Sequence, residues 1–399
     1  MIGIEYILLG AGFLLFISVI LSRVTSLLDI PTLILFLLIG LFLDSTAVFG
    51  PSIQNYTTIQ NISIFVLIII MFSGGLDTDI KKMKPIASIG ISLSTFGVLI
   101  TAFVTGLFLH LVIGFDLILS LLIGSVVSST DAAAVFSIFK SGEIKLKDNL
   151  AEILELESAT NDPMAYILTL TFLFLMLNPT TSIWDAIILF VQSLVFGSII
   201  GYLFGKLSSK LIEGVNLDIK GLYPVLLISL ALLSFSCAEL IGGNGFLAVY
   251  ISALIIGNSK IPNKQSQISF FDGMGWLTQI VMFIVLGLFA FPEQLLKTAG
   301  ISLATAFAIT FFSRPIAVFA SLTPFKVKLK NKLFISWTGI KGAVPIVFAT
   351  YPLVAGIPEA PVIFNVVFFI TIISVILKGA TLKTIAKKLN VLIENENEE

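Results

Sequence analysis

Apolar runs of roughly 20 residues recur along the whole chain, and this pattern constrains the fold more than any other feature. Of the 399 residues, 57% are hydrophobic and only 12% are charged. An ordinary soluble domain has a charged fraction of about 25%, because its surface faces water. Backbone polar groups must be paired inside lipid, which favours helices. The sequence therefore predicts an all-α polytopic membrane protein.

Charges, prolines, glycines and polar clusters divide these runs into thirteen predicted spans. The second and third spans are short and the boundary near Leu240 is indistinct, which leaves twelve or fourteen spans as alternatives. We expect one transmembrane domain, residues 1–381, followed by a short tail, residues 382–399. The predicted spans are residues 3–22, 30–43, 61–76, 86–114, 116–139, 151–177, 183–206, 222–240, 241–257, 270–291, 297–320, 332–355 and 360–380.

Lysine and arginine gather on alternate connections between these spans, and Lys297 is the lone cation on the others. Loops that stay in the cytoplasm hold excess positive charge. We therefore expect a cell-membrane protein with its N-terminus outside and its C-terminus in the cytoplasm. Asp77 and the lysines from Lys81 to Lys84 are expected to form a solvated cytoplasmic loop. The net charge of −1 gives no basic field for nucleic acid.

Five ionisable side chains lie deep in predicted spans, where each costs at least ~2.5 to 3.5 kcal/mol and is a functional candidate by default. Two bases can neutralise two of the three acids, which leaves one carboxylate free to exchange its counter-ion. Lys378 lies near a span end, where we expect its ammonium to reach the interface cheaply. The five deep residues are Asp131, Glu157, Asp162, Arg314 and Lys341.

Two spans are interrupted by polar residues and glycine. The fifth contains Ser128-Ser129-Thr130-Asp131, and the twelfth contains Thr338-Gly339-Ile340-Lys341-Gly342. Unwound backbone at this depth is tolerated where it lines a polar cavity, and paired broken helices mark transporter sites. The breaks fall in the fifth members of two six-span halves joined by the seventh span. This arrangement predicts inverted repeats with two broken, crossing helices.

The sixth span carries several polar residues at mid-membrane depth. On a helix, Glu155, Ser158 and Asp162 share one face, and Glu157 and Asn161 share the next. The proline that follows Asp162 lacks an N–H group and predicts a kink beside the acid. We therefore expect a polar helix face within the membrane.

A carboxylate in a partly dry cavity can hold a proton or a dehydrated alkali cation, but not both. We expect Asp162 to be this group, with Asp131, Ser158 and the Thr130 carbonyl completing a transient oxygen shell for a hard cation. Asn161, also in the predicted ion-binding and proton-binding set, holds no exchangeable proton. A single titrating acid predicts electroneutral, one-for-one exchange.

Lys341 is placed opposite Glu157 as a permanent ion pair between the two broken regions. Arg314 is a competing partner, and the sequence does not decide between the two bases.

Several segments resemble the monovalent cation:proton antiporter-1 family, the NhaP-like exchangers. They are Thr130-Asp131, Glu157 to Pro163, and Trp337 to Ala343. Ser129 to Phe136, Asn244 to Tyr250, Asp272 to Trp276 and Lys341 to Pro345 are similar to the bacterial potassium/proton subgroup. The resemblance spans nearly the whole chain.

The resemblance implies a homodimer of thirteen-helix protomers with the NhaA-like antiporter fold. It implies a core of roughly residues 86–177 and 297–380, and a dimerisation part of roughly 3–76 and 183–291. In the family, the counterpart of Asp162 carries ion and proton. The counterpart of Glu157 pairs with a base from the second half.

Two positions depart from the family pattern. Lys341 stands where the family usually has arginine, and lysine cannot form a bidentate fork with a carboxylate. Many relatives have an acid where this chain has Ser73, before Gly74 and Gly75. Ser73 is a possible substitute that offers oxygen without charge.

Two alternatives to exchange of K+ or Na+ for H+ are a monovalent cation channel and an intramembrane enzyme. A channel would show a repeated filter or rings of like charge, and neither is present in the sequence. An enzyme would need a nucleophile with a base, or a metal set, but the chain has one histidine and one cysteine. No cofactor is predicted.

Overall fold

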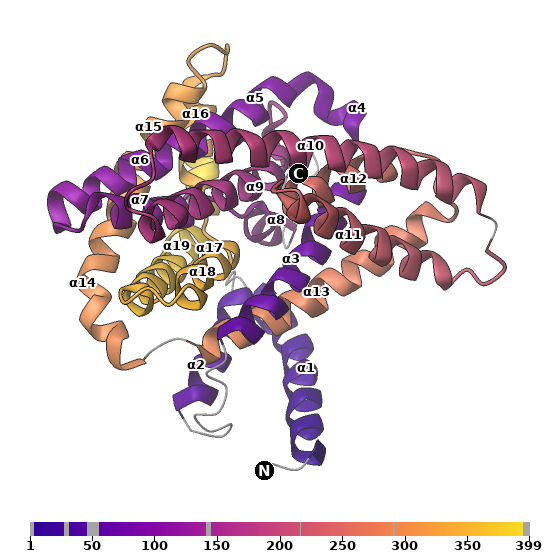
Figure 1. Cartoon of the computed structure of the whole chain (residues 1–399), viewed down its shortest axis with the longest axis horizontal. Helices are drawn as coiled ribbons and strands as arrows, with labels where there is room; N and C mark the ends of the chain where they lie inside the picture. Colours follow the sequence, from indigo (N-terminus) through magenta and orange to yellow (C-terminus); the bar gives the residue numbers. More distant parts are fainter. Residues whose placement is uncertain are drawn as a thin grey trace, which may run out of the picture.

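The computed structural model describes residues 4–27, 32–45, 56–140, 145–215, 217–289 and 292–393, and these are mostly helical (Figure 1). Within these ranges, every predicted span coincides with a helix or with a pair of half-helices. Eight helices there are long and apolar enough to cross a membrane, and shorter apolar helices accompany them. The expected all-α polytopic membrane fold is confirmed.

Seven helices lie outside the two broken-helix regions. Among them, α10 carries small residues at Gly197, Gly201 and Gly205, one turn apart, where α12 packs against it. Small residues at this spacing let two helix backbones approach closely within a membrane. The seven are α1 (Ile4–Leu27), α2 (Thr32–Ser45), α3 (Tyr56–Asp77), α10 (Ile183–Gly214), α11 (Leu222–Leu240), α12 (Gly245–Gly257) and α13 (Lys264–Leu288).

The first broken-helix region begins with a continuous run of short helical segments and ends with a long helix. Asp116 caps the first half-helix, because its side chain accepts a hydrogen bond from the Ile118 N–H at 2.9 Å. The segments are α4 (Ile80–Met83), η1 (Lys84–Ile86), α5 (Ala87–Ser92), η2 (Leu93–Gly97), α6 (Val98–Phe108), η3 (Leu109–Ile113), α7 (Leu117–Val126), α8 (Ala132–Lys140) and α9 (Leu150–Leu177).

The second region repeats this order of a long helix, a broken helix and another long helix. Both regions contain π-helical turns, η2 and η3 in the first and η4 in the second. The second region comprises α14 (Pro292–Ala308), η4 (Ile309–Ser313), α15 (Arg314–Ser321), α16 (Leu329–Trp337), α17 (Val344–Phe348), α18 (Thr350–Val354) and α19 (Ala360–Lys388). In Figure 1 its orange and yellow helices lie beside the violet and magenta helices of the first region.

The segment after residue 381 continues a helix and then forms a short strand. Helix α19 continues to Lys388, and β2 (Leu392–Ile393) pairs antiparallel with β1 (Lys145–Leu146). This pairing attaches the end of the chain to the connection between α8 and α9. The expected boundary between membrane domain and tail at residue 381 falls inside α19. The acidic residues 394–399 lie outside the described ranges.

Candidate functional site

The two breaks cross each other and are joined by backbone and side-chain hydrogen bonds. The Asp131 N–H donates to the Ile340 carbonyl at 2.8 Å. The Lys341 ammonium donates to the carbonyls of Ser129 at 2.8 Å and Ser128 at 3.3 Å. These carbonyls follow the last turn of α7, where helix carbonyls lack helical partners and carry partial negative charge. Lys341 therefore neutralises the C-terminal end of this half-helix.

Helix α9 holds the first break from the side. Ser158 Oγ accepts a hydrogen bond from the Ala132 N–H at 3.0 Å and donates to the Thr130 carbonyl at 3.1 Å. Asn161 Nδ2 donates to Thr130 Oγ1 at 2.7 Å and to its carbonyl at 3.3 Å. The backbone groups left unpaired by unwinding therefore find partners on the next helix.

Helix α19 holds the second break through residues spaced about one turn apart. The Ser374 hydroxyl accepts from the Lys341 N–H at 3.0 Å, and the Lys378 ammonium donates to the Gly339 carbonyl at 2.6 Å. The Trp337 indole donates to Thr381 Oγ1 at 3.1 Å. Lys378 was expected to reach the interface, but its side chain is 1% exposed and turns inward to the break. Its position near a span end in the sequence misled this prediction.

The deep ion pair joins Glu157 to Arg314. Their side chains approach to 2.6 Å between Nη2 and Oε1, and both are 2% exposed. The preferred partner from the sequence, Lys341, was wrong, and the competing partner is the one that the structure pairs. Lys341 instead lies against the carbonyls at the end of α7. Arginine suits the pairing with Glu157 because its planar guanidinium matches the geometry of a carboxylate.

A cavity of ≈ 420 Å³ leads to Asp162 from one side of the membrane domain. On α9 its lining runs from Ala151 to Asp162, and on α3 from Ile70 to Asp77. The cavity therefore opens on the side of the membrane domain where α9 starts and α3 ends. Thr130, Asp131 and Ser158 also line the cavity, as do Ser129 and the stretch 342–345 of the second break. The structure thus brings four of the predicted ion-binding residues together.

Asp162 is 7% exposed and lies at the inner end of this cavity. Its Oδ1 atom is buried and has no hydrogen-bond partner among the described residues. A buried acceptor without a partner is costly unless a proton or a cation satisfies it. The arrangement can therefore hold one exchangeable positive species against oxygen ligands.

Two predicted residues do not line the cavity. Asn161 lies behind the lining, fully buried, and orients Thr130. Ser73 is half-buried on α3, and its hydroxyl lies near Gly275 of α13. The structure does not bring Ser73 to the cavity.

Two acids at the cavity mouth were missed as site residues. Asp77 ends α3 and is exposed, as expected for an acid beside a solvated loop, but it also lines the cavity, which the sequence did not indicate. Glu155 lines the cavity one turn before Ser158. The shared helix face of Glu155, Ser158 and Asp162 was a usable signal for Glu155. The position of Asp77 depends on how α3 packs beside α9.

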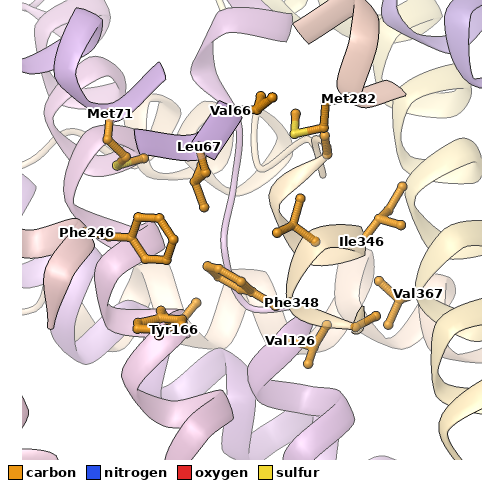
Figure 2. Packing of buried hydrophobic residues seen from close by; sticks show 14 of the residues in the cluster. Val66, Leu67, Met71, Val126, Tyr166, Phe246, Met282, Ile346, Phe348 and Val367 are labelled. Atoms are coloured by element: carbon orange, nitrogen blue, oxygen red, sulfur yellow. The ribbon is translucent and has the colours of Figure 1, made fainter. Parts of the chain in front are cut away.

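An aromatic layer lies beyond Asp162, away from the cavity mouth. Tyr166 follows Asp162 by one helical turn and packs on Phe246 with ring centroids 4.9 Å apart and on Phe348 at 5.7 Å. Figure 2 shows these three rings facing one another, with Val66, Leu67 and Met71 of α3 above them. All are buried in one apolar cluster. This layer excludes water on the far side of Asp162.

Comparisons with known proteins identify the family of this chain. Residues 12–388 match the profile of the family described as sodium/hydrogen exchanger, transmembrane. The K+/H+ antiporter NhaP of Alkalimonas amylolytica is 36% identical over 395 residues, which cover 99% of this chain and 69% of that protein. The K+/H+ antiporter NhaP2 of Shewanella sp. strain ANA-3 is 38% identical over 386 residues, 96% of this chain and 67% of that protein.

A solved structure shows the same fold. The sodium proton antiporter MjNhaP1 from Methanocaldococcus jannaschii at pH 8 superposes with a TM-score of 0.84 at 23% identity, covering 95% of this chain and 100% of that one. The resemblance inferred from the motifs is confirmed by these matches. The chain therefore belongs to the transmembrane sodium/hydrogen exchanger family.

Proposed function

We propose that this chain is a secondary antiporter that exchanges K+ or Na+ for H+ across the cell membrane, one ion for one proton. The observation that carries the proposal is the buried, unpartnered Asp162 Oδ1 at the end of a one-sided cavity. Glu157 and Lys341 already have partners, Arg314 and the α7 carbonyls. Family membership, with relatives named K+/H+ and Na+/H+ antiporters, favours antiport over a channel.

In the proton-bound state, the Asp162 carboxyl is neutral and tolerates its dry surroundings. When a cation arrives, the proton leaves through the cavity and the carboxylate binds the metal ion. The Thr130 carbonyl, the Asp131 carboxylate and a free lone pair on Ser158 Oγ complete the hard oxygen shell that K+ or Na+ prefers. Asn161 keeps Thr130 in place without itself binding the ion.

Access then has to alternate between the two sides of the membrane. The cavity opens on the lysine-rich face, which the positive-inside rule assigns to the cytoplasm, and the aromatic layer closes the other side. We propose that the core, roughly 86–177 and 297–380, moves against a dimerisation part, roughly 3–76 and 183–291. The protein would act as a homodimer with its N-terminus outside.

The test is exchange by the purified full chain in proteoliposomes that contain a pH-sensitive dye. Wild type should alkalinise an acid-loaded lumen when KCl or NaCl is added outside. Asp162→Asn should reduce the signal to that of empty liposomes, because the variant binds neither species as a counter-ion. Its melting temperature should stay close to wild type. A series of Li+, Na+, K+ and Rb+ salts then identifies the preferred ion.

Asp218→Asn is the matched control, since this acid is exposed on the connection between α10 and α11. It should exchange like wild type. Wild-type turnover in Asp162→Asn would refute the site. A steady cation current without proton movement would indicate the channel alternative instead.

A further inference from the structure

A groove with a volume of ≈ 440 Å³ lies between α5–η2 and α15. Its walls come from the two different broken-helix regions, which pack against each other here (Figure 1). They are tied by a 2.8 Å hydrogen bond from Ser92 Oγ to the Ser321 carbonyl. Ile91 and Phe96 line the groove with side chains 52% and 62% exposed. Large exposed apolar side chains on a membrane domain face lipid, so the groove opens to the bilayer.

The groove lining mixes hydroxyl groups with apolar side chains, and two exposed lysines flank it in the sequence. Exposed Lys84 lies one turn before Ser88, and exposed Lys326 directly follows Phe325, so each wall is flanked by a lysine outside the lining. Hydroxyl groups follow at Ser92 and Ser321, and Ile100 lines the deeper part. At about 1.5 Å rise per residue, Lys84 to Ile100 spans roughly 24 Å. Lysines beside a lipid-facing groove of hydroxyl and apolar groups suit an amphiphile with an anionic head.

One hydroxyl in the groove is unsatisfied. Ser321 is 4% exposed, and its Oγ has no hydrogen-bond partner in the described part of the chain. The π-helical turn η2 (Leu93–Gly97), which supplies part of the opposite wall, is a rare conformation that is frequent at functional sites. The buried Oγ lies toward Gly97 of the opposite wall, and rotation of the side chain would let it donate to a carbonyl or phosphate oxygen of a guest.

We propose that this groove binds an anionic phospholipid from the leaflet on the lysine-rich face. Lys84 and Lys326 hold the phosphate, Ser321 donates to an ester carbonyl, and an acyl chain lies against Phe96 and Ile100. Basic pockets between membrane helices attract anionic headgroups through charge, and the stems of lysines can pack on the chains. The bound lipid bridges the two broken-helix regions. The proposal does not depend on the transported ion.

Native mass spectrometry of the purified full chain tests this proposal. The chain is mixed with phosphatidylglycerol or with phosphatidylcholine of the same acyl composition, and the retained lipid is measured. We expect wild type to retain phosphatidylglycerol preferentially. The double variant Lys84→Ala/Lys326→Ala should retain it about tenfold less, because the variant loses the electrostatic attraction of two lysines for the anionic headgroup. Ser321→Ala, which removes a hydroxyl without a partner, should lower retention several-fold and leave the melting temperature unchanged without lipid.

A second variant and a charge-matched control keep the interpretation specific. Ala320→Trp fills the groove and should reduce retention without any change of charge. The double variant Lys206→Ala/Lys210→Ala removes two exposed lysines of α10, which does not line the groove, and should retain lipid like wild type. Equal retention of the two lipids by wild type would overturn the proposal. So would an equal loss in the α10 control, or full retention in Lys84→Ala/Lys326→Ala.

Discussion

The first break, Val127 to Asp131, is held by α9 through a hydroxyl and an amide, whereas the second, Thr338 to Ala343, is held by α19 through a hydroxyl and a lysine. The two long helices occupy corresponding places in their regions. Helix α9 carries buried acids, and α19 carries a buried base at Lys378. The two regions therefore share one architecture, but their long helices carry buried side chains of opposite charge.

This difference supports the proposal that the first break binds the ion and the second holds it in place. The first break presents Thr130 and Asp131 to the cavity beside Asp162. In the second break, the Gly339 carbonyl is occupied by the Lys378 ammonium. Lys341 extends from the second break to neutralise the α7 end of the first. The acids that line the cavity thus lie on one side of the crossing, and the buried lysines Lys341 and Lys378 belong to the other.

The largest expected effect comes from separating the deep ion pair that joins the halves. Arg314→Met leaves Glu157 charged and buried, and should lower the free energy of unfolding by about 3–5 kcal/mol. The double variant Arg314→Met/Glu157→Gln should lose less, because no charge is then stranded. Denaturation in detergent measures both. Losses that simply add across the double-mutant cycle would contradict a direct interaction between the two residues.

Removing the lysine that caps the second break should have the next largest effect. Lys378→Met keeps the side-chain length but releases the Gly339 carbonyl, and should cost about 1.5–3 kcal/mol, as for hydrogen bonds to charged groups. Exchange in proteoliposomes should slow, because Lys341 is then less well placed. Thr381→Val is the control, since it removes only neutral hydrogen bonds, one from the Trp337 indole and two to carbonyls of its own helix. Equal losses of stability in Lys378→Met and Thr381→Val would show that the buried ammonium supports the second break no more than a neutral hydrogen bond does.

Matched serines sharpen the comparison at the level of single hydrogen bonds. Ser158→Ala and Ser374→Ala each remove a hydroxyl that accepts a backbone N–H within a break, at 3.0 Å in both cases. Each should cost about 1 kcal/mol of stability. The KM for the cation should rise several-fold only in Ser158→Ala, because only Ser158 lines the cavity. A similar rise in both variants would indicate that Ser158 acts by structure alone.

The smallest expected effect lies outside the membrane, where Asp148 joins the two broken helices. Hydrogen bonds from Asn331 and Lys328 lower the pKa of Asp148 below its usual value. A lowered folded-state pKa adds stability above the unfolded value of about 3.9 and loses it as pH falls through the folded value. Asp148→Asn should therefore cost less than about 1 kcal/mol at pH 7, because the pair is largely exposed.

The pH dependence separates this electrostatic effect from a packing effect. The stability difference between wild type and Asp148→Asn should shrink as the pH is lowered below about 4, where the wild-type carboxyl becomes protonated. Lys332→Ala, a neighbouring lysine on α16 that contacts the Phe319 ring, serves as the control and should not show this convergence. A constant difference between wild type and Asp148→Asn at all pH values would exclude the charge interaction as its cause.

Features that depend on one segment were predictable from the sequence. The two breaks were found because hydroxyls, glycines and charges interrupt apolar runs. The shared face of Ser158 and Asp162 was found because residues three and four apart meet on any helix. Pairings between distant segments were harder. Arg314 and Lys341 are both predicted at a membrane depth close to that of Glu157. Depth alone does not say which of the two side chains points toward the Glu157 carboxylate.

The sequence by itself determined that the chain crosses a membrane in many helices and where two of them break, and it singled out Asp162 as the candidate for exchange. It determined these because lipid makes each polar residue costly, so that those retained mark the site. Only the tertiary structure decided that Arg314 pairs with Glu157, that Lys378 turns inward, and that Asp77 rather than Ser73 lines the cavity. Helix rotation and tilt are set by packing against neighbouring helices, and hydropathy along one segment does not contain that information.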